Sequence, residues 1–129
     1  MEKNELLMKF AYLKEQGEIL MRNIAMMEDR LKETLIARNT LEELKKIDKG
    51  ELLVPIGGGC YIEADIKKLN KITINVGAGI AKEVSIEESI SKLDENTDNI
   101  KKVISNAREN LSKIEKELAA IDQELRKQQ

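Results

Sequence analysis

The chain is 129 residues long, the length of one domain, and its two Tyr, one Phe and no Trp stand against 36% charged residues, so a large globular interior is not expected. Lys and Arg number 22 and Asp and Glu 24, with both signs balanced along the chain, which leaves no basic stripe for nucleic acid. The sequence shows neither a signal-peptide pattern nor an apolar run long enough to span a membrane, so we expect a cytoplasmic protein, and the single cysteine excludes an internal disulfide.

The first third predicts one helix over residues 4–48, because residues 4–47 hold no Pro and one Gly. Its seam positions, spaced alternately four and three apart, are Leu6, Phe10, Leu13, Gly17, Leu20, Ile24, Met27, Leu31, Thr34, Arg38 and Leu41. A mostly apolar seam of this spacing is typical of a coiled coil. The cations Lys45, Lys46 and Lys49, with Gly50 just beyond, indicate the end of this helix.

The middle third, residues 50–84, predicts two β-hairpins. Leu52–Pro55 and Cys60–Ile66 flank a run of three glycines, and Lys71–Val76 and Ile80–Val84 flank Gly77-Ala78-Gly79. Alternation along the second strand predicts that Cys60 is a small buried hydrophobe. Hairpins this small are marginal alone, so apolar residues on them are expected to mediate oligomerisation, namely Leu53, Val54, Ile56, Ile62, Ile66, Ile72, Ile74, Val76, Ile80 and Val84.

The stretch ITINVGAGIAKEV, residues 72–84, also has an alternative interpretation as a phosphate-binding turn. A dinucleotide fingerprint needs Gly or Ala where Lys82 stands, and no second parallel strand follows it. With no His and one Cys, no Ser-His or Cys-His arrangement is possible. A transition-metal site would have to be made of carboxylates, and the pairs Glu42-Glu43, Glu87-Glu88 and Asp94-Glu95 are better explained as solvated helix faces. We therefore expect no enzyme activity, no metal and no cofactor.

The last third predicts a second helix over residues 85–128, with Ser85 and Glu88 as a capping box at its start. Only Thr97 is polar among its seam positions, which are Ile86, Ile90, Leu93, Thr97, Ile100, Ile104, Ala107, Leu111, Ile114, Leu118, Ile121 and Leu125. The two helices match in length, so each is expected to be the antiparallel partner of the other.

One register of this pairing places two polar seam residues opposite each other and sets small residues against large ones. With Leu41 opposite Ile90, the two seam threonines, Thr34 and Thr97, face each other, so that a hydroxyl need not be buried against leucine. The same register sets Leu6 against Leu125, Gly17 against Ile114 and Ile24 against Ala107.

The ends of the two helices, far from the hairpins in this arrangement, carry more apolar residues than one seam can cover. All five methionines lie in the first 27 residues, and methionine adapts to partners of varied shape. The residues expected to bind a client there are Leu6, Leu7, Met8, Phe10, Tyr12, Leu13, Leu118, Ile121 and Leu125.

These features resemble one known family. The segments Leu52-Leu53-Val54-Pro55-Ile56-Gly57 and Ile74-Asn75-Val76-Gly77-Ala78-Gly79, with coiled-coil helices on both sides, look like the alpha-type subunit of prefoldin, as in archaea. The chain has Ala78 and Ile80 where that family usually has threonine and an aromatic residue.

The resemblance implies a mainly α fold with small β content, in which two hairpins join a long antiparallel two-helix coiled coil and form an oligomeric β-barrel platform. It also implies an ATP-independent holding chaperone, in which two alpha-type and four beta-type subunits grip unfolded polypeptide at the tips and deliver it to a group II chaperonin of the cytosol. Some archaeal members of the family assemble with themselves instead. The rival interpretation is a structural or tethering coiled coil that binds one folded partner.

Overall fold

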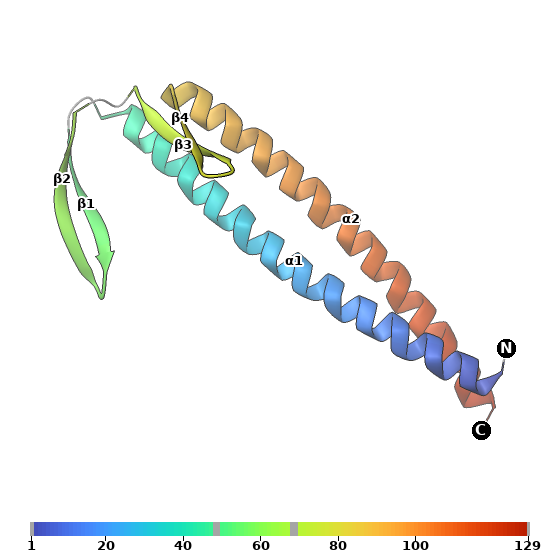
Figure 1. The fold of residues 1–129 in the computed structure, drawn as a ribbon. Coiled ribbons are helices and arrows are strands. Elements are labelled where there is room, and N and C mark those ends of the chain that lie inside the picture. The colour runs from blue at the N-terminus through green and yellow to red at the C-terminus, as the bar shows by residue number, and fades with distance from the viewer. Residues whose placement is uncertain (1, 48–49, 68–69, 129) are drawn as a thin grey trace. The chain divides into compact units, whose positions relative to one another are not determined.

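The computed structural model describes residues 2–47, 50–67 and 70–128. The elements follow in the order α1 (Lys3–Lys45), β1 (Gly50–Gly57), β2 (Cys60–Ile66), β3 (Ile72–Gly77), β4 (Ile80–Val84) and α2 (Ile86–Lys127) (Figure 1). The predicted fold class, two long helices with two small antiparallel hairpins, is confirmed. The chain divides into two compact units, of which unit 1 combines Met1–Lys32 with Asp98–Gln129 and unit 2 is Glu33–Thr97.

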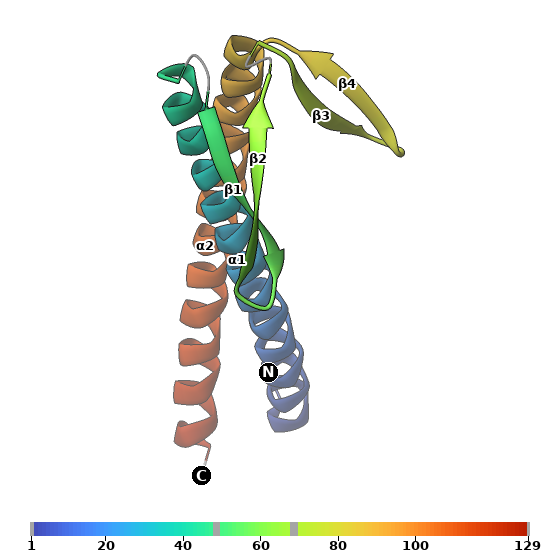
Figure 2. The same cartoon turned by 90° about the vertical axis from the view of Figure 1, so that its left-hand side faces the viewer.

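The seams of both helices are where the sequence predicted them, since every seam position named above is buried or half-buried. Within unit 1 the segments of α1 and α2 run side by side in opposite directions (Figures 1 and 2). A Cβ placed on Gly17 would lie 3.5 Å from Ile114 Cγ2, which confirms the expected facing of these two positions. In unit 2, Leu41 forms a buried cluster with Ile86 and Ile90, as the same register requires.

The layer one heptad further along unit 2 holds Thr34 on α1 and Thr97 on α2. Thr97 is buried, and among the residues described its Oγ1 has no hydrogen-bond partner. The expected placement of Thr34 opposite Thr97 therefore provides no hydrogen bond to the buried Thr97 hydroxyl within the described part of the chain. Direct packing of the two threonines stays a prediction.

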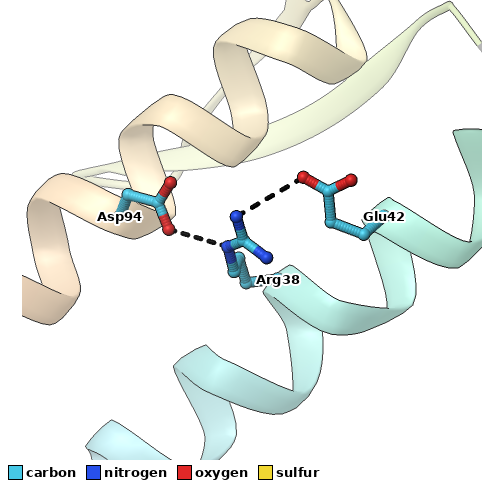
Figure 3. Close-up of polar contacts among 3 residues, drawn as sticks. All are labelled: Arg38, Glu42 and Asp94. Carbon is cyan, nitrogen blue, oxygen red and sulfur yellow. Dashed lines mark hydrogen bonds and ion pairs between the residues drawn. The ribbon is translucent and has the colours of Figure 1, made fainter.

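A charged side chain occupies one seam position of unit 2. Arg38 turns to the edge of the seam, where its Nε donates to Asp94 Oδ1 on α2 at 2.8 Å and its guanidinium lies 3.4 Å from Glu42 Oε1 (Figure 3). The hydrogen bond to Asp94 and the charge of that carboxylate raise the pKa of Arg38. The guanidinium thus keeps its charge and a partner on the opposite helix, while its alkyl stem covers the seam.

The end of α1 differs from the prediction. The helix stops at Lys45, and the Lys46 and Ile47 N–H groups donate to carbonyls three residues back, each at 3.1 Å, which tightens the last turn. Residues 48 and 49, with the cation Lys49, lie outside the described part of the chain. Gly50 lies beyond the end of α1, as expected, and opens β1 without a positive φ. A Cβ at this position would lie 2.8 Å from Ile47 Cγ2, so a larger residue would have to displace the Ile47 side chain.

The start of α2 is the predicted one. The Glu88 N–H donates to Ser85 Oγ at 3.0 Å, and the Ser89 N–H donates to the Ser85 carbonyl at 3.0 Å. Ser85 is therefore the N-cap of a helix that begins at Ile86 and ends at Lys127. The reciprocal bond from the Glu88 carboxylate stays a prediction.

The two hairpins form separate two-stranded sheets, β1–β2 and β3–β4 (Figure 2). Each closes through a two-residue turn with positive φ at both residues, the geometry that fits the twist of antiparallel strands. Gly58 and Gly59 supply φ of 58° and 76° in the first turn, and Ala78 and Gly79 supply 53° and 74° in the second. Ala78 thus adopts a left-handed conformation that an L side chain disfavours.

The second hairpin contributes a partly buried apolar residue to the buried cluster of unit 2. Ile72, opposite Val84 in the β3–β4 ladder, packs against the cluster formed by Leu41, Ile86 and Ile90. Neither α1 nor α2, within the residues described, holds an apolar stretch of the kind that traverses a bilayer.

Candidate functional site

Three large apolar side chains are exposed near the start of α1. Leu7, Met8 and Tyr12, which we call the tip cluster, keep 46%, 74% and 61% of their surface accessible. They follow the seam residues Leu6 and Phe10 by one or two positions, so helix geometry turns them away from α2. The first turn of α1 and the last turn of α2 lie at the same end of unit 1 (Figure 1). Among the described residues, the tip cluster is thus an exposed apolar surface.

The remaining residues of the predicted client site belong to the seam. Leu6 and Ile121 are buried, at 5% and 7% exposure, and they hold α1 against α2. The half-buried ones are Phe10, Leu13, Leu118 and Leu125. The structure therefore divides the predicted client-binding residues into seam residues that pack between the helices and the exposed tip cluster. The role of both groups in client binding stays a prediction.

Most of the apolar residues predicted to mediate oligomerisation are exposed to solvent in the hairpins. Val54 and Ile62 are cross-strand neighbours in β1–β2 and are exposed together. Of the predicted oligomerisation residues, the structure exposes Leu53, Val54, Ile56, Ile62, Val76 and Ile80 and leaves half-buried Ile66, Ile72, Ile74 and Val84. The exposed ones form surface that the chain itself does not cover, and their role in assembly stays a prediction.

The prediction for Cys60 was wrong. Cys60 is exposed, and its Sγ contacts only the Gly58 carbonyl oxygen among the hydrogen-bond partners described, at 3.9 Å. The alternation of β2 placed Cys60 correctly on the face of Ile62, but both residues are exposed in the part of the chain that the structure describes. Tyr61, on the opposite face against Pro55, is exposed as well and was missed. An aromatic residue paired with a proline on a short strand is the signal that could have marked it.

Unit 1 also has two grooves beside the seam, which positions facing the other helix do not reveal in the sequence. One groove, of about 290 Å³, includes Met26 of α1 and Val103 and Ala107 of α2 in its lining. The other, of about 400 Å³, is lined by residues that include Glu28 and Arg108. These two residues form an ion pair between α1 and α2.

The described surfaces expose mainly apolar side chains. Among the described residues, no three His, Cys, Asp or Glu side chains gather in a metal-binding group. What the surfaces offer is apolar area, and apolar area binds other apolar surfaces without direction.

Comparison with known proteins decides between the possible families. The sequence model of the prefoldin subunit family matches residues 13–129. The chain belongs to the prefoldin family. The alpha-type prefoldin resemblance is confirmed by relatives among the archaea. The prefoldin subunit alpha of Pyrococcus horikoshii is 36% identical over 126 residues, which cover 93% of this chain and 85% of that protein.

Two further comparisons agree. The prefoldin subunit alpha of Thermococcus onnurineus is 37% identical over 99 residues, 72% of this chain and 67% of that protein. The cryo-EM structure of filamentous PFD from Methanocaldococcus jannaschii superimposes with a TM-score of 0.74 over 94% of this chain and 98% of that one, at 20% identity, which shows the same fold. Prefoldin is a family of chaperones and not of enzymes, and its alpha subunits assemble into oligomeric prefoldin complexes.

Proposed function

We propose that this prefoldin-family chain is a subunit of an ATP-independent holding chaperone, which binds unfolded polypeptide at the helix tips and delivers it to a group II chaperonin of the cytosol. The observation that carries the proposal is the tip cluster. Leu7, Met8 and Tyr12 are exposed beside the closed seam. An unfolded chain also exposes apolar side chains, and burial of both surfaces stabilises the complex.

The size of the tip cluster explains why several subunits are needed. If a client covers about 150 Å² of apolar area at one tip, burial stabilises the contact by about 4 kcal/mol, which corresponds to a Kd of about 1 mM. One tip therefore holds a client only briefly. Several tips on one assembly raise the affinity, because each later contact forms at high effective concentration. Release then requires no nucleotide.

The exposed hairpin faces support assembly as the second part of the proposal. Two-stranded sheets are marginal alone, and Val54 and Ile62 present an apolar face with no cover from their own chain. In an assembly of two alpha-type and four beta-type subunits, or of copies of this chain, such faces close into a β-barrel platform. The free strand edges are then paired as well.

The test is suppression of aggregation with two unrelated unfolded proteins. The tip variant carries Leu7→Ser, Met8→Ser and Tyr12→Ser, which leaves Leu6 and the seam intact. The matched control carries Leu35→Ser and Ile36→Ser, exposed apolar residues elsewhere on α1. We expect the tip variant to assemble normally and to lose most of the protection of both clients, and the control to keep it.

Two results count against the proposal. If the tip variant protects both clients as well as the unmodified protein, then the tip cluster is not the binding surface. If the unmodified protein protects neither client and instead forms a stoichiometric complex with one folded protein, then the chain is a tethering coiled coil.

A further inference from the structure

The two flanks of the seam in unit 1 differ in their chemistry. The groove that includes Met26 and Val103 in its lining lies on one flank, which we call the neutral flank. The groove lined by Glu28, Lys101 and Arg108 lies on the other, which we call the charged flank. Both grooves include Ile104 of the seam, so they open on opposite sides of the same packed layer.

Helix periodicity extends each flank beyond its groove, because residues seven apart lie on the same face. From Met26 the neutral flank continues to Ile19 and Tyr12, and from Asn23, which also lines the groove, it continues to Gln16. On α2 it continues from Val103 to Asn110. Around the groove the neutral flank thus combines apolar side chains with side-chain amides, and the same spacing adds the charged Lys9 and Glu117 nearer the tip.

The charged flank continues in the same way from its own groove. Met21 and Lys14 lie seven and fourteen residues before Glu28, and Glu115 and Asp122 lie seven and fourteen after Arg108. Glu28 and Arg108 are already paired across the helices, and Asp122 pairs with Arg126. This flank carries mostly solvated charged side chains, with Met21 and Leu7 as exposed apolar residues among them, so it offers an uncharged ligand less continuous apolar area.

We propose that the neutral flank is a track for one extended segment of unfolded polypeptide, which continues inward from the tip cluster through Tyr12. The inference rests on the proposed function and adds the part of the client that the arm recognises. Apolar client side chains enter the groove at Met26 and Val103. The amides of Gln16, Asn23 and Asn110 hydrogen-bond to the client backbone.

The chemistry of the amides selects this occupant. Each amide both donates and accepts, so it pairs with peptide N–H and C=O groups whatever the client sequence. An extended segment carries these groups unpaired along its length. The apolar positions recur about every 10.5 Å along α1, which is about three residues of an extended chain. Of the described residues that line the groove, only Arg30 is charged, so an acidic or nucleic-acid partner finds little opposite charge there.

The groove has room for such side chains. Its volume of about 290 Å³ arises where Ala107 faces Ile24, a small residue against a large one. Met26 is 65% exposed at its edge and is flexible, so it fits client side chains of different shape. Met21 makes a matched control, because it is 52% exposed on the same helix but lies on the charged flank.

The test places the photoreactive residue p-benzoylphenylalanine at position 26 or at position 21 of the assembled protein. The probe is reduced, carboxymethylated α-lactalbumin, which stays unfolded. We expect cross-links to the probe mainly from position 26. Equal yields from both positions, or a higher yield from position 21, overturn the proposal. Cross-links from position 26 to a second copy of the chain in place of the probe overturn it too.

Affinity gives the second measurement. Met26→Asp is expected to weaken binding of the probe about tenfold, since it removes apolar area and requires a carboxylate to be desolvated. Met21→Asp is expected to leave binding unchanged. Circular dichroism and size-exclusion chromatography confirm that both variants fold and assemble.

The outcomes separate this inference from the proposed function. If the tip variant loses the probe but Met26→Asp binds as tightly as the unmodified protein, the neutral flank is not a client track and the tip proposal stands. If the unmodified protein binds neither this probe nor another unfolded chain, the proposed function fails and the track fails with it.

Discussion

Gly17 of α1 faces Ile114 of α2 so closely that a Cβ on the glycine would lie 3.5 Å from Ile114 Cγ2 and 3.7 Å from Leu111 Cδ1. Both distances are ordinary van der Waals contacts, so alanine fits without displacing its neighbours. Gly17→Ala is expected to raise the free energy of unfolding by about 0.5–1 kcal/mol, because glycine loses more backbone entropy in a helix. Urea denaturation at a fixed protomer concentration measures this. Gly17→Leu, which overfills the same space, serves as the contrast, and a loss of stability with alanine would contradict the register.

The buried hydroxyl of Thr97 predicts a second stabilising change. Its Oγ1 has no hydrogen-bond partner among the residues that the structure describes, and an unsatisfied buried hydroxyl destabilises the fold. Thr97→Val keeps the shape and removes the polar atom, so we expect the free energy of unfolding to rise by about 1 kcal/mol. The control is Thr40→Val, because Thr40 Oγ1 donates to the Ile36 carbonyl at 2.9 Å and is exposed. A rise in the control but not at Thr97 would contradict the assignment.

The helices and their register could be predicted from the sequence because both follow from spacing. The alternating four-and-three spacing specifies which residues face the partner helix, and every one of them is buried or half-buried. The match of Thr34 with Thr97, supported by small residues opposite large ones, selected the register, and the contact of Gly17 with Ile114 agrees with it. The N-cap at Ser85 was predictable for a similar reason, since it is a local interaction.

The sequence could not predict whether a given apolar face is buried by neighbouring residues or exposed to solvent. Alternation placed Cys60 and Ile62 on one face of β2, but whether that face is buried depends on other chains. In the same way composition grouped Leu6 with Leu7, although the first is buried in the seam and the second is exposed. The grooves beside the seam depend on the sizes of several side chains from both helices, which a seam count does not register.

The left-handed conformation of Ala78 predicts a change in the second hairpin. Its φ of 53° is unfavourable for alanine, while glycine adopts it without strain. Ala78→Gly is expected to stabilise β3–β4 by about 0.5–1 kcal/mol. Slower hydrogen exchange of the β3 and β4 amides would show it. Ala81→Gly, in a strand position with ordinary φ, should speed the exchange instead, and protection that is unchanged in both variants would argue against strain at Ala78.

The N-cap of α2 predicts a loss of stability that a second acceptor restores. Ser85 Oγ accepts from the Glu88 N–H at 3.0 Å, and alanine leaves this donor without a side-chain partner. Ser85→Ala is expected to lower the free energy of unfolding by about 1 kcal/mol, while Ser85→Asp keeps the native value. Ser91→Ala, within the body of α2, is the control and should not destabilise. If Ser85→Asp loses as much as Ser85→Ala, the hydroxyl does not act as a cap.

The exposed face of the first hairpin predicts how assembly responds to a charge. Ile62 and Val54 are neighbours across β1–β2, and both are exposed in the single chain. If this face is an interface, Ile62→Lys must bury an unpaired ammonium group there, so the assembly should dissociate. Ile36→Lys puts the same lysine on the exposed surface of α1, outside the hairpins, and should leave the assembly intact. Light scattering after size-exclusion chromatography measures the mass of each variant, with and without a beta-type prefoldin subunit. An unchanged mass for Ile62→Lys in both conditions, or dissociation only with Ile36→Lys, would show that the apolar face of β1–β2 does not join the subunits.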